Sequence, residues 1–243
     1  MRIIMPFDFK KEYKEFYMPK KKPEIVTVPK ANYIAVRGKG DPNEEGGEYK
    51  VSIGLLYTIA FTLKMSKRTG HEIEGFFDYV VPPLEGFWWQ EGTKEIDFSR
   101  KEDFCWISVI RLPDFIKKED FEWALKEAEH KKKTDFSKVE FLAIEEGLCV
   151  QIMHIGAYDD EPESVALMDE YLVKEGYEND FSEIQPEYEK NKLELGNVRL
   201  HHEIYLSDAR KVEPARRKTV IRHPVKVREA DRCDSCTAMQ NGD

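Results

Sequence analysis

Apolar residues recur along this chain in two patterns, short β-branched runs and longer segments with helical spacing. The short runs, bounded by Gly, Pro and Asp, predict strands at 24–28, 32–38, 76–81, 104–112, 139–146, 148–156, 198–206 and 217–225. Val51, Leu55, Ile59 and Leu63 recur at every fourth position, which is typical of one buried helix face. Helices are predicted at 49–65, 117–133 and 163–176. Strands and helices therefore alternate twice, which indicates an α+β fold.

Three segments fall outside this alternation. Residues 1–23 mix lysines with aromatic residues and end in prolines, which predicts an extended arm lying over the domain rather than a helix. Residues 82–92 carry two adjacent tryptophans beside two prolines and a glycine, which predicts a rigid loop. Residues 226–243 are expected to form a flexible tail.

The second round of strands and helices repeats the first. Gly38 aligns with Gly156 and Asp41 with Asp159, and both pairs are 118 residues apart. Two copies of a β-α-β-β unit explain this spacing better than two unrelated domains do. We therefore expect one domain made of two pseudo-twofold-related halves with a central ligand cleft. The expected boundaries are 24–225 for the domain and about 24–133 and 138–225 for its halves.

Each half can cover only one face of its strands with its helix, so the other face needs a partner. We expect the other half to be that partner, with a cleft along the seam. Within 198–206, strand alternation places His202, Ile204 and Leu206 on one face, which we expect to meet the helix. The opposite face, which we expect to line the cleft, carries His201, Glu203 and Tyr205.

Glu203 is the strongest candidate for chemistry in this cleft. The residue aligned with it in the first half is Val109, so a carboxylate would face an aliphatic wall. Desolvation among aromatic rings raises the pKa of a carboxyl group and makes it a better proton acceptor near neutral pH. The alternative is a buried ion pair between Glu203 and a nearby arginine, Arg111 or Arg199.

The loop at 82–92 supplies the second signal. Trp88 and Trp89 are candidates to clamp a flat ligand, with packing into the core as the alternative. Glu85 is either a second cleft carboxylate or a solvated turn residue. Tyr57 and Tyr79 lie in apolar surroundings and are candidate hydroxyl donors, again with core packing as the alternative.

Charge and composition narrow the classes of partner. The 243 residues contain 38 Lys and Arg against 47 Asp and Glu, a formal charge of -9. Such a balance repels nucleic acid and anionic lipid over most of the surface, so neither is an expected partner. No apolar run approaches the roughly 18 residues of a membrane span, and no signal peptide is evident. We therefore expect a cytoplasmic protein.

The cysteines and histidines do not predict a metal site. Cys105 and Cys149 stand alone, while Cys233 and Cys236 form a CxxC in the tail that lacks the second pair of a zinc ribbon. No phosphate-binding glycine loop, nucleophile elbow or HExxH is present. We expect no metal and no cofactor.

Four stretches carry a resemblance to a known family. They are YMPKKKPEIVTVPKANYIAVRGKGDPN, FDYVVPPLEGFWW, WISVIRLPDF and HHEIYLSDARK. Together they resemble the GyrI-like small-molecule-binding superfamily over roughly residues 10–225, in its stand-alone branch without a DNA-binding part. The resemblance implies a pseudo-twofold cleft for flat, aromatic, often cationic compounds, with a buried glutamate at the position of Glu203.

The resemblance to some stand-alone members implies an activity. This activity is the hydrolysis of cyclopropane-bearing, DNA-alkylating compounds, a detoxifying reaction. On this hypothesis Glu203 activates water, Tyr79 or Tyr57 steadies the carbonyl, and Trp88 and Trp89 hold the ligand. The alternative is a binding module that sequesters aromatic cations without chemistry. A third possibility is an interaction protein similar to gyrase inhibitors. We expect a monomer or a weak homodimer.

Overall fold

The computed structural model describes residues 5–91, 93, 96–97, 99–182 and 199–228. Its strands are β1 Glu24–Val28, β2 Ala31–Lys39, β3 Leu84–Gln90, β4 Phe104–Arg111, β5 Glu140–Ile144, β6 Gly147–Ile155, β7 Tyr177–Asn179, β8 His201–Tyr205 and β9 Lys218–Val227. Its α-helices are α1 Phe9–Glu12, α2 Lys14–Tyr17, α3 Glu48–Lys64, α4 Lys118–Lys132 and α5 Glu161–Glu175. None of the helices in these ranges is long and apolar enough to cross a membrane.

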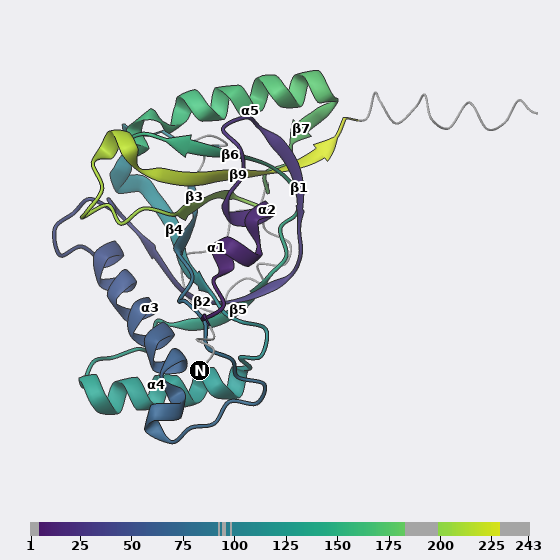
Figure 1. Cartoon of the computed structure of the whole chain (residues 1–243). Coiled ribbons are helices and arrows are strands. Elements are labelled where there is room, and N and C mark those ends of the chain that lie inside the picture. Colours follow the sequence, from purple (N-terminus) through teal and green to yellow (C-terminus); the bar gives the residue numbers. More distant parts are fainter. Residues whose placement is uncertain (1–4, 92, 94–95, 98, 183–198, 229–243) are drawn as a thin grey trace, which may run out of the picture.

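The strands form one antiparallel sheet in the order β1-β6-β9-β8-β3-β4-β2-β5, with β7 paired to β9 (Figure 1). In this order β1, β2, β3 and β4 of the first half have β5, β6, β8 and β9 of the second half as their respective counterparts. If every strand is replaced by its counterpart, the order is the same read from the other end of the sheet. The α+β fold with pseudo-twofold halves is thereby confirmed. The central pair is β3 with β8, one strand from each half. The sequence alignment that set Glu203 against Val109 is wrong, because Val109 lies on β4, whose counterpart is β9.

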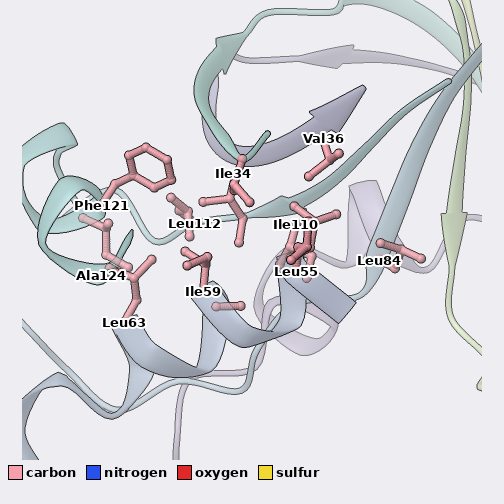
Figure 2. Close-up of a cluster of buried hydrophobic side chains, with 14 of the residues drawn as sticks. Ile34, Val36, Leu55, Ile59, Leu63, Leu84, Ile110, Leu112, Phe121 and Ala124 are labelled. Carbon is pink, nitrogen blue, oxygen red and sulfur yellow. The ribbon is translucent and has the colours of Figure 1, made fainter. Parts of the chain in front are cut away.

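The helix α3 packs on the first half of the sheet. Its side chains Leu55, Ile59 and Leu63 point toward Ile34 and other buried residues of the strands, as Figure 2 shows. Recurrence at every fourth position gives this helix a continuous apolar face. The helix α4 packs beside α3 and contributes Phe121 and Ala124 to the same core.

The helix α5 is the counterpart of α3 in the second half. Its first turn contains a proline, and it ends at the cap residue Gly176, whose φ of 78° is the left-handed conformation common at helix C-termini. Met168 and Leu172 pack on Val150, Ile152 and other residues of β6 and β9. Burial of this apolar stripe, rather than helix propensity, is what fixes such a helix on a sheet.

The helices α3 and α5 lie on the same face of the sheet. In the strand register Ile34 pairs with Ile110 and Ile110 with Leu84, and these three residues form one core with α3. Two residues further along β3, Gly86 pairs with Glu203, which in turn pairs with Ile221 under α5. Because side chains alternate along a strand, the face that carries Glu203 is the face that carries both helices.

The N-terminal segment covers part of the opposite face. There the Tyr17 hydroxyl donates to Glu85, 2.9 Å away, and Arg222 donates to the Phe16 carbonyl. The prediction that each half covers the other is therefore wrong, because the two halves join edge to edge in one sheet. The arm also contains two four-residue helices, α1 and α2, which bury Phe9 and Tyr17 (Figure 1).

Two local predictions around the tryptophans are wrong as well. Residues 76–81 form no strand, and only Tyr79 makes an isolated bridge, to Phe7. Residues Leu84–Gln90, predicted as a loop, are the central strand β3, and all seven are buried. A strand buried on both faces has no alternation of polar and apolar residues, so it lacks the usual sequence signal.

Candidate functional site

Glu203 lies in the middle of the sheet with hydrogen-bond donors on two sides. His201 Nε2 is 2.9 Å from Glu203 Oε1, and the Tyr205 hydroxyl also bonds to this carboxylate. Alternation along β8 places all three side chains on one face, as predicted. Only 7% of Glu203 is exposed. The prediction that this face points away from the helices is wrong, because the opposite face meets the N-terminal segment.

Aromatic side chains surround Tyr205. Trp88 Nε1 donates to the Tyr205 hydroxyl at 2.8 Å, and Tyr49 of α3 also forms a hydrogen bond with it. The Tyr158 ring lies edge-on to Tyr205, with centroids 5.8 Å apart. The three tyrosines are partly exposed whereas Trp88 is buried. The site therefore surrounds a buried carboxylate with aromatic rings and hydroxyl groups that bond to one another.

Burial and charge hold these hydroxyls in their protonated form. Burial and then the negative charge of Glu203 raise the pKa of Tyr205 well above its usual value. Burial likewise raises the pKa of Tyr49 and of Tyr158. These hydroxyls are therefore hydrogen-bond donors at neutral pH rather than phenolates.

Glu161 is a second carboxyl group in this place. It occupies the first turn of α5, is 0% exposed, and lies next to Glu203. Burial raises its pKa well above the usual value, and so do the charge of Glu203 and a hydrogen bond with Glu203. Glu161 has no distinctive signal in the sequence, because an acidic residue at a helix N-terminus has an ordinary explanation in the helix dipole.

His201 connects the carboxyl groups to another histidine. His201 Nδ1 is 2.7 Å from His223 Nε2. Burial and then the nearby His201 lower the pKa of His223 well below its usual value, so His223 is neutral. We call the set Glu161, His201, Glu203, Tyr205, Trp88, Tyr49 and Tyr158 the Glu203 site.

Three of these side chains also have the donor atoms of a metal site. Glu161, His201 and Glu203 each offer one atom, and all three atoms lie within 4.8 Å of one another. Two carboxylates and one imidazole suit several divalent transition metals. In the described part of the chain this is the one group with such geometry. The expectation of no metal considered only histidine and cysteine spacing and so overlooked this arrangement.

A second polar cluster lies on the opposite face of the sheet, directly behind the Glu203 site. His202 Nε2 is 3.1 Å from Glu85 Oε2, and His202 Nδ1 is 2.9 Å from Glu146 Oε2. Arg222 Nη1 is 2.8 Å from the other Glu146 oxygen. Here each carboxylate has a cationic or hydroxyl partner, Tyr17 included, so the cluster is neutralised internally. Its contacts fasten the N-terminal segment to the sheet.

The structure brings some of the predicted site residues together and separates others. Trp88, His201, Glu203 and Tyr205 meet in the Glu203 site. The other five predicted site residues lie elsewhere. On the opposite face of the sheet, Glu85 bonds to Tyr17, Trp89 packs with Phe87 and Cys105, and Arg111 lies over the rings of Phe9 and Tyr13. Tyr79 packs among Phe76 and Phe115, and Tyr57 bonds to the Leu84 backbone.

The two tryptophans point to opposite faces of β3, and both are buried. Trp88 packs near Tyr49 and Phe104, whereas Trp89 belongs to the core on the other face. A clamp formed by both indoles is therefore excluded by the strand geometry. Glu85 is neither a cleft carboxylate nor a solvated turn residue, since it is buried against Tyr17 and His202.

Neither arginine that could have neutralised Glu203 contacts it. Arg111 lies on the other face, near Tyr17. Arg199 pairs with Asp180 and bonds the carbonyl oxygens of Leu148 and Val225. The ion-pair explanation of Glu203 therefore fails for both candidates. Cys105 and Cys149 are free and buried, and Cys233 and Cys236 lie outside the described residues.

Comparison with protein families gives one match. The profile of the GyrI-like small molecule binding domain matches residues 21–194. No match to a curated protein sequence was found.

Solved structures give matches with higher coverage. A hydrolase from Listeria innocua is 43% identical, with a TM-score of 0.77, over 90% of this chain and 100% of that chain. A hydrolase encoded by lin2189 from Listeria innocua is 44% identical, with a TM-score of 0.79, over 91% and 100%. The EcmrR C-terminal domain is 12% identical, with a TM-score of 0.51, over 85% and 98%, and at that identity it shows a common fold alone.

Proposed function

Because this chain belongs to the family of GyrI-like small-molecule-binding domains, we propose that it is a hydrolase acting on flat, aromatic, cyclopropane-bearing compounds at the Glu203 site. Glu203 carries the chemistry by accepting a proton from the attacking water. Opening such a ring destroys an alkylating electrophile, so the biological role is detoxification. The Listeria innocua relatives described as hydrolases support a hydrolytic reaction.

The observation that carries the proposal is the setting of Glu203. It is a buried carboxylate whose described partners are His201, Tyr205 and Glu161, with no arginine or lysine in contact among the described residues. A carboxylate committed to a structural ion pair is a poor base, because its positive partner stabilises the ionised form. Among the described residues no arginine or lysine holds Glu203 in its ionised form in this way.

The reaction needs one water molecule and no redox partner. The water oxygen forms a bond to a cyclopropane carbon, and the carbon–carbon bond of the strained ring breaks. Its electron pair moves into the conjugated carbonyl group, which becomes a phenolate or enolate oxygen. Glu203 accepts the proton that the water loses, and the carbonyl oxygen is protonated on leaving. Positioning the water next to the ring carbon is worth a large part of the acceleration.

The neighbouring aromatic residues orient the ligand in this proposal. The partly exposed tyrosines Tyr49 and Tyr158 are the groups that a ligand reaches first, with Trp88 behind them. Tyr158 takes the role of carbonyl donor that the sequence hypothesis gave to Tyr79 or Tyr57, because Tyr158 lies against Tyr205 whereas Tyr79 packs among phenylalanines.

The test is to incubate the protein with a synthetic aromatic cyclohexadienone bearing a fused cyclopropane and to weigh the recovered compound by mass spectrometry. The proposal predicts a gain of one water, faster than in a protein-free control that measures spontaneous solvolysis. Saturable binding with the compound recovered intact would instead support a module that sequesters aromatic or cationic ligands. That result would overturn the hydrolase.

A further inference from the structure

We propose that Glu161, His201 and Glu203 form a binding site for one divalent transition-metal ion such as Zn²⁺. The three side chains are buried, and each offers one donor atom, with all three atoms within 4.8 Å of one another. They come from two elements, the first turn of α5 and the strand β8, which the fold brings together at the Glu203 site. The inference goes beyond the proposed hydrolysis, since binding of an ion is measured without any substrate.

Glu161 is the residue that points to a cation. Its side chain is 0% exposed, and among the described residues neither carboxylate oxygen receives a hydrogen bond from an N–H or O–H donor. Carboxylates in such surroundings are almost always hydrogen-bonded, paired with a cation or bound to a metal. A proton placed between Glu161 and Glu203 bridges only two of the three donor groups, whereas a cation bonds to all three.

A divalent cation also balances the charge of the site. In the described part of the chain no arginine or lysine contacts Glu161, and the one ion pair of Glu203 is with His201. The imidazole of a metal-bound histidine is neutral, so the two carboxylates give the ligand set a charge of about -2. Burying uncompensated charges is costly, and a divalent ion makes the whole group neutral.

The spacing of the donor atoms fits one ion. Zinc holds nitrogen and oxygen ligands at about 2.0–2.2 Å, so its ligands lie about 3–4.4 Å from one another. His201 Nε2 and Glu203 Oε1, which are 2.9 Å apart, already have the separation of adjacent ligands. Small rotations of the side chains bring the third donor, from Glu161, within this range. An imidazole beside two carboxylates favours transition metals over Mg²⁺ and Ca²⁺, which prefer oxygen ligands alone.

Neighbouring groups hold the three ligands in place. His201 Nδ1 lies 2.7 Å from His223 Nε2, and a hydrogen bond donated there leaves the Nε2 lone pair of His201 for the ion. The Tyr205 hydroxyl bonds to the Glu203 carboxylate. Glu161 is fixed by the first turn of α5, which contains a proline. Outer partners of this kind orient metal ligands and raise their affinity for the ion.

A bound ion and the proposed hydrolysis use Glu203 in different ways. A carboxylate that binds a cation is held in its ionised form and is a poor acceptor for a proton from water. We therefore expect the metal-free protein to hydrolyse its substrate and the loaded protein to be a resting form. This consequence alone rests on the proposed function, and the metal site itself does not.

Isothermal titration with Zn²⁺ tests the site directly. The parent protein is the full chain with Cys233→Ser and Cys236→Ser, so that the thiol pair of the tail binds no zinc. We expect one ion per chain and no binding of Mg²⁺. Glu161→Gln should lower the affinity by more than about a hundredfold, beyond the 10- to 100-fold typical of outer partners. Absence of zinc binding by the parent, or equal affinity in Glu161→Gln, would overturn the inference.

The matched control is Asp120→Asn. It removes a carboxylate that lies 3.1 Å from the ring of His71, a histidine–carboxylate pair without a third donor. Its zinc affinity should equal that of the parent. A loss as large as that in Glu161→Gln would mean that zinc binds at histidine–carboxylate pairs in general, and this would overturn the assignment to the Glu203 site.

Cobalt spectroscopy and turnover complete the test. Co²⁺ in place of Zn²⁺ should give visible absorption bands in the parent and in Asp120→Asn, and bands that persist in both Glu161→Gln and Glu203→Gln would overturn the site. One equivalent of Zn²⁺ should stop turnover of the cyclopropane-bearing compound, and a chelator should restore it. Turnover of the loaded protein at the metal-free rate would overturn the placement of the ion on Glu203. If neither form turns the compound over, the proposed function fails while the titration still decides the metal site.

Discussion

Gly86 of β3 lies directly opposite Glu203 of β8 at the centre of the sheet. A Cβ atom at Gly86 would lie 2.7 Å from Trp88 Nε1 and 3.1 Å from the Tyr205 hydroxyl. Because glycine has no side chain, there is room here for the hydrogen bond from Trp88 to Tyr205. Tyr205 in turn bonds to Glu203. The two halves thus contribute unlike residues to the central pair, a glycine from one and a carboxylate from the other.

Gly86→Ala should disrupt this arrangement. The added methyl group overlaps the Trp88–Tyr205 hydrogen bond, and we expect the free energy of unfolding to fall by about 1–3 kcal/mol from overpacking. Gly54→Ala is the control, since a Cβ there meets nothing within 4 Å and the position is an exposed helix interior. It should raise the free energy of unfolding by about 0.5–1 kcal/mol. Urea unfolding of both variants measures the difference, and equal effects would contradict the packing described.

Trp88→Phe and Trp89→Phe form a matched pair of adjacent, buried indoles on opposite faces. Trp88→Phe loses the hydrogen bond to Tyr205. It should weaken binding of a flat aromatic ligand by about fivefold, since an aromatic contact is worth about 1 kcal/mol. Trp89→Phe should lower the free energy of unfolding but leave ligand affinity unchanged, because Trp89 lies in the core on the opposite face of the sheet. Isothermal titration of both variants with the same ligand checks this. Equal loss of affinity would mean that the ligand does not lie on the Trp88 face.

Glu146→Gln should change how stability depends on pH. Burial raises the pKa of Glu146, but the charges of His202 and Arg222 and their hydrogen bonds outweigh it and lower the pKa from 4.5 to about 2. The stabilisation from this group is therefore present above pH 4.5 and lost as pH falls from 4.5 toward 2. The free energy of unfolding of the variant should be lower by about 3–5 kcal/mol at pH 7, because the buried Arg222 loses its carboxylate partner. The free energy of unfolding of the variant should therefore fall less than that of wild type when the pH is lowered.

The control for this variant is Glu178→Gln at the surface pair with Lys226. Both side chains there are about half exposed, so we expect a change of about 0–1 kcal/mol. His202 contributes in the opposite direction. Burial lowers its pKa, but the charge of Glu146 and hydrogen bonds to both glutamates raise it from 6.5, so its stabilisation is present below pH 6.5 and lost as pH rises. Identical acid unfolding curves of wild type and Glu146→Gln would contradict the buried cluster.

Local signals in the sequence predicted much of the fold. The spacing of Leu55, Ile59 and Leu63 located α3, and Gly176 marked the end of α5, because each signal acts within a few residues. Alternation correctly placed His201 and Glu203 on one face of β8, since that pattern is a property of the strand itself.

The remaining features depend on residues far apart in the sequence. Glu161 joins Glu203 only because α5 packs on the sheet, and its sequence context is that of an ordinary acidic helix start. Strand alternation predicted that His202 faces the helices, but it lies on the opposite face, where it contacts Glu85 and Glu146. The strand β3 escaped detection because Trp89 and its neighbours are buried on both faces. Such long-range packing overrides local pattern.

The most direct test of the account is turnover of a cyclopropane-bearing aromatic substrate by wild type and by Glu203→Gln, with ligand affinity measured on both proteins. The amide keeps the size of the side chain and its place beside His201, but it accepts no proton from water. We expect kcat to fall by about 10²- to 10⁴-fold while affinity changes little. Undiminished formation of the hydrated product by Glu203→Gln would contradict the role of Glu203 as the base.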